Sequence, residues 1–388
     1  MNNTKLWNTN FFYILILGTV NAIALGMTLP LLPSFLTGLG ASLSFAGLFV
    51  GLFSFVALVG RPFASIMGDR LNKKWLLGVF LFLNGFFTLI YIFAPSVMWM
   101  LPIRVLHGLA FSVSGTIIFA LGAEFIPKQR IGEGIGFLGI GQIIGMAVGP
   151  NIGINIVELH SYQLNFIIGG AMVMAAGLSL AAMKYKHSAP PPQEKRALHL
   201  QDFLAVELLP NVIFVAIFTL GMGLINAYLV LFGYARGIGN IGLYFIVNAI
   251  IVLLSRPLLG RMTDRKGVSA MILPGYILAA IALVLIGSAY SIWPILIAAV
   301  LFAIGAGGSM PAIQTDCLQR LDVTRRTVAT GTYMIGLDIG MTIGQVFGGT
   351  AFDTFGFDIT FYATGALMVV GFGFYLGYIK RLRRLGKW

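Results

Sequence analysis

Ionisable side chains are scarce inside the apolar runs of this sequence, and three of them could do acid–base chemistry. Arg104 and His107 lie one helical turn apart in "LPIRVLHGLAFS", and Asp338 lies in "YMIGLDIGMTIG". A charge at the centre of a membrane helix costs about 2.5–3.5 kcal/mol, so each such residue implies a function or a paired structural role.

The three residue types suit different steps of proton transfer. Burial disfavours a charged carboxylate, so Asp338 is a candidate proton carrier. An arginine keeps its proton but favours ionisation of a nearby carboxylic acid, so Arg104 is a candidate organiser of proton traffic. His107 could titrate near neutral pH. For Asp338 and His107 the alternative is structural, with each only hydrogen-bonded to its surroundings.

The composition places these residues in a membrane protein. Hydrophobic residues make up 58% of the 388 and charged residues 10%, whereas a soluble domain has about 25% charged residues. Apolar runs of about 20 residues, each long enough to cross a bilayer, recur along the chain. The net charge of +12 therefore does not indicate nucleic-acid binding. A single cysteine, Cys317, excludes an internal disulfide and a cysteine metal cluster, and we expect no cofactor.

Twelve helices are predicted, and the first is expected to be retained rather than cleaved as a signal peptide. Their ranges are 11–32, 43–66, 75–94, 97–122, 132–157, 164–183, 209–232, 240–259, 270–290, 292–316, 327–350 and 357–379. The lysines and arginines, except Arg104 and Arg236, then fall on one side. This side is cytoplasmic by the positive-inside rule, so both termini are expected inside the cell, with the chain in the inner membrane.

The second half of the chain repeats the first at a constant offset of 195 residues. "RPFASIMGDRLNKK" begins at Arg61 and "RPLLGRMTDRKGVS" at Arg256. The same offset pairs Gly47 with Gly242, Arg130 with Arg325, Gly136 with Gly331, and Gly141, Gly145, Gly149 and Gly153 with Gly336, Gly340, Gly344 and Gly348. Six helices are an even number, so the copies form a parallel repeat. We expect a bundle over 1–185, a cytoplasmic linker over 186–205 and a second bundle over 206–388.

At the end of the second predicted helix, the chain resembles the major facilitator superfamily, in its 12-helix drug:proton antiporter group. That family carries Gly-x-x-x-Asp-Arg-x-Gly-Arg/Lys-Arg/Lys here, and the matching residues are Asp69, Arg70, Lys73 and Lys74. Ser65 and Asn72 replace the usual glycines. The second copy keeps Gly260, Asp264, Arg265 and Gly267 without the basic pair.

The resemblance implies a cytoplasmic gate, in which Asp69 accepts hydrogen bonds from the N-terminus of helix eleven. Glu124 could then hold Arg70 or Arg130. The alternative is that these charges only enforce topology.

The fifth predicted helix, "GIGQIIGMAVGPNIG", carries a glycine at every fourth position, which lets helices pack closely in lipid. It also resembles the superfamily's antiporter signature through Gly136, Gly145, Gly149, Pro150 and Gly153, although Ile154 replaces the closing glycine. This likeness implies exchange of substrate for protons. "RVLHG" similarly resembles the family's Arg-x-x-Gln-Gly motif, with His107 in the glutamine position.

The resemblance implies that helices one, four, seven and ten surround a central cavity, with helices five and eight at the interface between the two halves. Candidate lining residues are Asn21, Phe111, Ser114, Gln142, Asn226, Tyr228, Asn248, Met310 and Gln314. The alternative for the aromatic and methionine side chains is a position in the core or against lipid.

The sequence therefore predicts a monomeric secondary transporter that moves a small-molecule substrate and protons through membrane lipid by alternating access. Export of amphipathic organic molecules is the first hypothesis. Export of a polar metabolite such as a metallophore, uptake, and a non-transporting sensor remain open.

An enzyme is disfavoured, because no histidine is placed to activate Ser42 or the serine of "GGSM", and there is no HExxH motif or Walker loop.

Overall fold

The computed structural model describes residues 6–93, 96–127, 130–185, 205–321 and 326–384, and over these ranges it contains helices and no strands. The long helices are α1 (Thr9–Thr28), α3 (Leu43–Arg70), α4 (Lys73–Ile90), α5 (Val97–Glu124), α6 (Ile131–Leu159), α7 (Tyr162–Ser179), α8 (Leu209–Ala235), α9 (Leu243–Lys266), α10 (Ser269–Gly287), α11 (Ile292–Arg320) and α12 (Arg326–Arg384). Short elements are η1 (Leu29–Leu31), α2 (Leu32–Gly38), η2 (Tyr91–Phe93), η4 (Leu180–Ala182) and η6 (Val206–Leu208).

These elements form twelve membrane-crossing segments, as the sequence predicts. In the described ranges, ten helical segments are long and apolar enough to span a bilayer. One of them, Val328–Arg384, contains two spans, because Gly356 adopts φ 79° and ψ 171° and interrupts the helix. The twelfth span is α9, whose apolar part is the shorter stretch Leu243–Arg256. The two shortest predicted connections are also present, since η2 ends at Phe93 before α5 begins, and α10 ends before α11.

The chain divides into two compact units. The first comprises residues 1–41 and 52–196, and the second comprises 42–51 and 197–388. The first turns of α3 thus pack with the second unit, while the remainder of α3 packs with the first. Most of the predicted linker, 186–204, lies outside the described residues.

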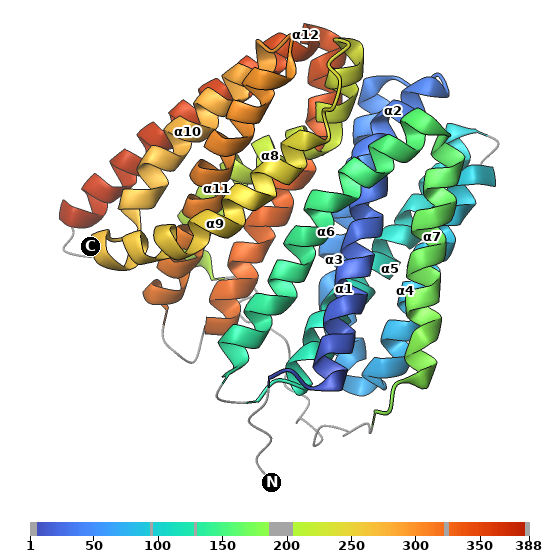
Figure 1. Cartoon of the computed structure of the whole chain (residues 1–388). Coiled ribbons are helices and arrows are strands. Elements are labelled where there is room, and N and C mark those ends of the chain that lie inside the picture. The colour runs from blue at the N-terminus through green and yellow to red at the C-terminus, as the bar shows by residue number, and fades with distance from the viewer. Residues whose placement is uncertain (1–5, 94–95, 128–129, 186–204, 322–325, 385–388) are drawn as a thin grey trace. The chain divides into compact units, whose positions relative to one another are not determined.

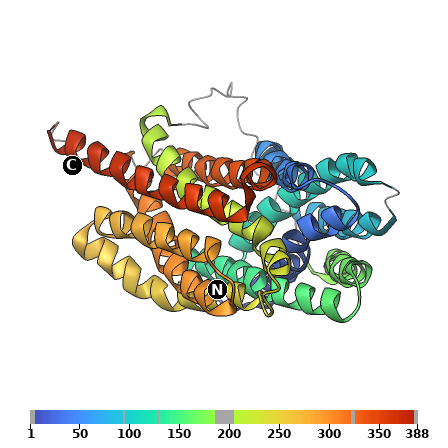
Figure 2. The same ribbon diagram turned by 90° about the horizontal axis from the view of Figure 1, so that it is seen from above.

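In the first unit, the glycine stripe of α6 packs on α1, and the two helices run side by side in Figures 1 and 2. A Cβ added to Gly149 would lie 2.4 Å from the carbonyl oxygen of Ile23, and one on Gly153 would lie 2.4 Å from that of Met27. Only glycine permits this separation of the two backbones. α6 continues as a helix through Pro150. Elsewhere in the unit, α4 packs between α5 and α7.

The second unit repeats this packing with different residues. Here α8 packs on the first part of α12, where a Cβ on Gly340 or Gly344 would lie 2.1 Å from the carbonyl oxygen of Ala216 or Leu220. α10 packs between α11 and the later part of α12, as α4 packs between α5 and α7. The glycine stripes therefore serve close helix packing in both units.

Arg236, one of the two basic residues outside the cytoplasmic set, is held at the end of α8. Its guanidinium forms an ion pair with Asp358 and donates to the carbonyl oxygens of Gly287 (3.0 Å) and Ala289 (2.6 Å). Its Cζ atom lies 4.2 Å from the ring centroid of Tyr290. This arginine connects three helix ends, so it has a structural role that accounts for its exceptional position.

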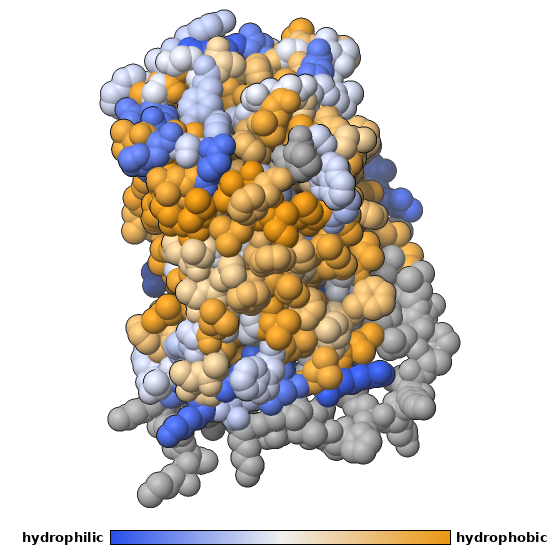
Figure 3. Space-filling view, turned by 90° about the vertical axis from the view of Figure 1, so that its right-hand side faces the viewer, coloured by the Kyte–Doolittle hydropathy of each residue, from blue (hydrophilic) through white to orange (hydrophobic). Residues whose placement is uncertain are grey.

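The surface carries the hydropathy pattern of a protein embedded in lipid. Figure 3 shows a broad band of hydrophobic residues across the middle of one face, with hydrophilic residues toward both ends. Large exposed apolar side chains in spanning helices include Phe55, Phe86, Leu178, Leu254 and Phe374. Such side chains would be unfavourable in water and are suited to contact with acyl chains.

Candidate functional site

A polar stripe runs along one face of α4 and continues into η2. Asn84, Thr88 and Tyr91 follow one another at helical spacing, and all three side chains are buried. Asn84 donates through Nδ2 to Oδ1 of Asn21 on α1, at 2.8 Å. Asn21, which the sequence suggested as a cavity residue, therefore forms a buried hydrogen bond between α1 and α4.

Tyr91 lies against the two ionisable residues of α5. Its hydroxyl oxygen is 3.3 Å from Nη1 of Arg104 and 2.8 Å from Nδ1 of His107. Arg104 is 1% exposed and His107 3% exposed. The Cζ atom of Arg104 lies 4.2 Å from the ring centroid of Phe53 on α3, a cation–π contact, and that ring also meets His107 edge-on. The structure thus brings Arg104 and His107 together around a tyrosine that the sequence analysis did not select.

The spacing of polar residues along α4 could have identified Tyr91 as a candidate. Asn84, Thr88 and Tyr91 occupy i, i+4 and i+7 and so share one helix face. A polar face on an otherwise apolar helix indicates a buried polar partner. Sequence reasoning missed it because the partner lies beyond the next turn of the chain.

Asp338, the third candidate for proton transfer, belongs to the second unit. It is half-buried on α12, between Gly336 and Gly340, which pack against α8. Its role as a carrier remains a prediction.

The region around Glu124 differs from its predicted arrangement. Glu124 accepts a hydrogen bond at 2.7 Å from Nζ of Lys73, at the start of α4, and one at 2.8 Å from the hydroxyl of Tyr185. Lys73 and Tyr185 are thus the partners of Glu124, whereas the sequence suggested Arg70 or Arg130. Lys73 is well placed because α4 begins beside the end of α5, whereas Arg70 is exposed at the end of α3. Burial and the Glu124 carboxylate both raise the pKa of Tyr185, so its hydroxyl remains a donor.

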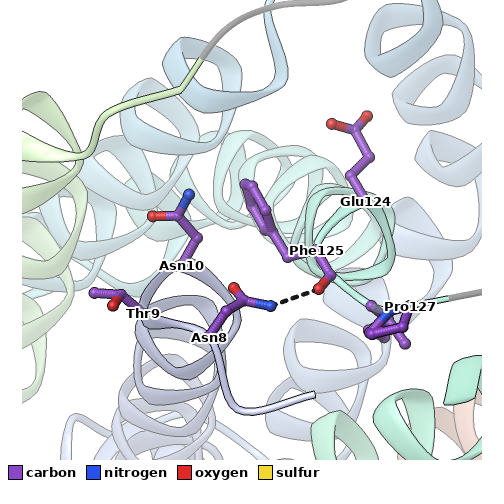
Figure 4. Close-up of a pocket in the computed structure, with 7 residues that line it drawn as sticks. Asn8, Thr9, Asn10, Glu124, Phe125 and Pro127 are labelled. Carbon is purple, nitrogen blue, oxygen red and sulfur yellow. Dashed lines mark hydrogen bonds between the residues drawn. The ribbon is translucent and has the colours of Figure 1, made fainter. Parts of the chain in front are cut away.

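A polar cavity of about 500 Å³ lies beside Glu124, between the start of α1 and the end of α5. Figure 4 shows the Asn8 side chain donating through Nδ2 to the carbonyl oxygen of Phe125, at 2.7 Å. Asn8 also caps α1, because its Oδ1 accepts from the backbone N–H of Phe11. The cavity is thus built on a helix start that is already capped.

For most of the remaining gate residues, the structure gives the position on a helix or next to one. Asp69 and Asp264 lie near the ends of α3 and α9, and their side chains are outside the described residues. Lys74 is buried and donates to the carbonyl oxygen of Ala181 at 3.1 Å. Arg265 is exposed near the end of α9, and Arg130 is the residue before α6. The gate remains a prediction.

A carboxylate at a helix N-terminus does occur within the second unit, at a position that the sequence analysis did not select. Asp353 on α12 accepts hydrogen bonds from the backbone N–H of Leu43 (3.3 Å), the backbone N–H of Ser44 (2.7 Å) and the Ser44 hydroxyl (2.6 Å). These groups begin α3. At the offset of 195 residues, Asp353 corresponds to Glu158. Both copies therefore carry an acidic residue at this position, which is the feature of the sequence that could have marked Asp353 as a candidate.

The predicted cavity residues have diverse surroundings. Tyr228 is fully buried and donates to the carbonyl oxygen of Gln345 at 2.7 Å, and Ser114 is also fully buried. Asn248 donates to the carbonyl oxygen of Ala299 at 3.1 Å. Half-buried side chains are those of Phe111, Gln142, Asn226, Met310 and Gln314. Gln314 lines a cavity of about 300 Å³ between α9 and α11, together with Arg256 and Thr263.

Comparison with known proteins agrees with this architecture. The sequence profile of the Major Facilitator Superfamily matches residues 14–242 and 233–387, which together cover nearly the whole chain. The chain belongs to the Major Facilitator Superfamily. It is therefore an integral membrane protein with the transporter fold that the repeat predicts.

Members of the superfamily with similar sequences include named efflux proteins. The multi-drug resistance efflux pump PmrA of Streptococcus pneumoniae is 23% identical over 362 residues, covering 88% of each chain. The multidrug resistance protein MdtG of Serratia proteamaculans is 26% identical over 388 residues, covering 94% of this chain and 92% of its own. The solved nucleoside transporter NupG superposes with a TM-score of 0.78 at 12% identity, covering 96% of this chain and all of that one, which shows the shared fold.

Proposed function

We propose that this superfamily transporter exports small amphipathic organic molecules in exchange for protons. The observation that carries the proposal is the buried Arg104, His107 and Tyr91 group in the first unit. A permanent cation inside a membrane bundle is costly, and such residues usually serve ion or substrate pathways. The relatives named as multidrug efflux proteins support export as the direction.

In the proposed mechanism, the bundles alternate between inward-open and outward-open states, and protonation shifts the balance between them. Asp338 supplies the exchangeable proton, because a half-buried carboxyl group can be neutral in one state and charged in the other. Arg104 is a fixed charge that favours one of these states. Both termini lie in the cytoplasm.

The test uses purified protein in liposomes, with ethidium as a fluorescent amphipathic probe and an imposed pH gradient. We expect ethidium transport to depend on the gradient and to fall at least about tenfold in Asp338→Asn and in Arg104→Ala, which equals about 1.4 kcal/mol or more in the barrier. Arg381→Ala, at an exposed arginine near the end of α12, is the matched control and should keep wild-type transport.

Two outcomes would contradict the proposal. Ethidium transport that ignores the gradient would remove proton exchange. Full activity in both variants would remove these residues from the mechanism.

A further inference from the structure

One hydroxyl group serves two basic side chains inside the first unit. Oη of Tyr91 lies within hydrogen-bonding distance of Nη1 of Arg104 and Nδ1 of His107, at 3.3 and 2.8 Å. All three residues are at most 3% exposed. Bulk water therefore does not replace these hydrogen bonds, and their donors and acceptors must match.

The donor inventory fixes the direction of the Arg104–Tyr91 bond, whereas the direction of the Tyr91–His107 bond depends on the tautomer of the imidazole. An arginine guanidinium has only donors, so Arg104 donates to Tyr91 Oη. The tyrosine hydroxyl has a single proton. The Tyr91 hydroxyl lies 2.8 Å from Nδ1 of His107, and when its proton points toward that nitrogen, Nδ1 is the acceptor. In that arrangement the imidazole is neutral and carries its proton on Nε2.

We propose that Tyr91 is a positioning residue that holds His107 neutral, with its proton on Nε2, while Arg104 is bound to the same hydroxyl oxygen. A proton added at Nδ1 would turn His107 from an acceptor into a donor. Two cationic donors would then meet at one oxygen atom and repel each other. Protonation of His107 and the Arg104–Tyr91 bond therefore oppose one another.

The side chains that neighbouring helices pack against the trio are mainly aromatic. α3 contributes the Phe53 ring, which lies over Arg104 and beside His107. α4 contributes Phe87, and α7 contributes Phe166, whose ring centroid is 6.1 Å from that of Tyr91. The titratable residue of α1 is Tyr13, which donates its hydroxyl hydrogen to Ser179. On α7, Tyr162 contacts Phe35.

For transport, and resting on the proposed function, the trio links a proton to a charge movement. A proton that reaches His107 weakens the Arg104–Tyr91 bond and so changes how the guanidinium is held. The sequence left two roles open for His107, a group that titrates near neutral pH and a hydrogen-bonded structural residue. The geometry instead makes its protonation conditional on Arg104.

The direct test reads the imidazole without any substrate. His160, His187 and His199 are replaced by glutamine, so that His107 is the sole histidine. Solid-state NMR of ¹⁵N-histidine-labelled protein in lipid bilayers at pH 6 then distinguishes the two ring nitrogens. We expect an unprotonated Nδ1 and a protonated Nε2. A protonated Nδ1 in this protein would overturn the proposal.

Tyr91→Phe removes only the hydroxyl group. We expect the doubly protonated fraction of His107 at pH 6 to rise about threefold or more, as expected when a hydrogen bond worth about 1 kcal/mol to the neutral form is lost. Tyr276→Phe is the matched control, because Tyr276 is also buried and donates to a backbone carbonyl, that of Phe214, at 2.9 Å. An unchanged Tyr91→Phe spectrum would contradict the positioning role.

The same variants separate this inference from the efflux proposal. In Tyr91→Phe liposomes, the pH of half-maximal ethidium transport should shift upward by about half a unit or more, and in Tyr276→Phe it should not shift. Loss of the hydroxyl with no shift in this pH would contradict the link to transport. The expected NMR result in protein that does not move ethidium would refute the efflux proposal and support the tautomer assignment.

Discussion

The α4–α5 region of the first unit and the α10–α11 region of the second have the same packing but different chemistry. At the offset of 195 residues, Tyr91, Arg104 and His107 correspond to Ile286, Ala299 and Phe302. Asn84 and Thr88 similarly correspond to Ala279 and Leu283. All five residues of the second unit are buried and apolar. The duplicated fold therefore keeps its packing in both copies, and the network of Tyr91, Arg104 and His107 has no counterpart at the matching positions of the second unit.

The chemical difference between the two units extends to the neighbouring helix, α3 in the first unit and α9 in the second. Phe53 of α3, whose ring lies over Arg104, corresponds to Asn248 of α9, whose amide donates to the carbonyl oxygen of Ala299. In each unit a large side chain covers the same point, with a ring facing a cation in one and an amide facing a backbone carbonyl in the other. The same packing thus holds either pair of side chains, and we expect the first unit to fold without the cation.

The largest effect should come from giving the first unit the chemistry of the second. The double variant Phe53→Asn/Arg104→Ala recreates the Asn248–Ala299 pair. We expect a folded protein with ethidium transport at least about tenfold lower, because the buried charge is lost while the packing is retained. Liposome transport and size-exclusion chromatography measure the two properties. Wild-type transport by this variant would show that the chemical difference between the units has no role in function.

A smaller effect should reveal what the two units share. Gly149→Leu and Gly344→Leu should each destabilise the protein by about 3 kcal/mol, because the new side chain meets a backbone carbonyl and must displace a helix. Thermal unfolding in detergent measures the loss. Gly139→Leu on α6 and Gly373→Leu on α12 are controls, since a Cβ at either position meets no atom within 4 Å. Strongly unequal losses at Gly149 and Gly344 would contradict equivalent packing.

The smallest effects should distinguish the acidic residues that end α5 and α11. Asp316 accepts from Asn211 Nδ2 and from Arg320 Nε, both at 2.7 Å, and its side chain is 8% exposed. The Glu124 side chain is 37% exposed. Asp316→Ala should cost about 2 kcal/mol, because it leaves buried donors without their acceptor. Glu124→Ala should cost about 1 kcal/mol or less. Unfolding midpoints compare them, and equal losses would show that burial does not set the difference.

Much of this architecture could be predicted because it rests on local properties. An apolar run of about 20 residues specifies a span wherever it occurs, and a glycine at every fourth position specifies a close helix contact. The duplication could be recognised because identical residues recur at a constant offset of 195 positions. Individual polar contacts were harder. The sequence suggested Arg70 or Arg130 as a partner of Glu124, whereas in the structure Glu124 bonds to Lys73 and Tyr185.

The sequence by itself determined the membrane class, the twelve spans, the repeat and the close packing of the glycine-striped helices, because hydrophobic length and small-residue spacing are properties of a single helix. The tertiary structure decided which polar groups meet. Tyr91 reaches Arg104 and His107 because a short turn folds α5 back along α4, and Asp353 reaches Ser44 across 309 residues of chain. Hydrogen bonds require atoms within about 3 Å, and only the packed helices set separations that small.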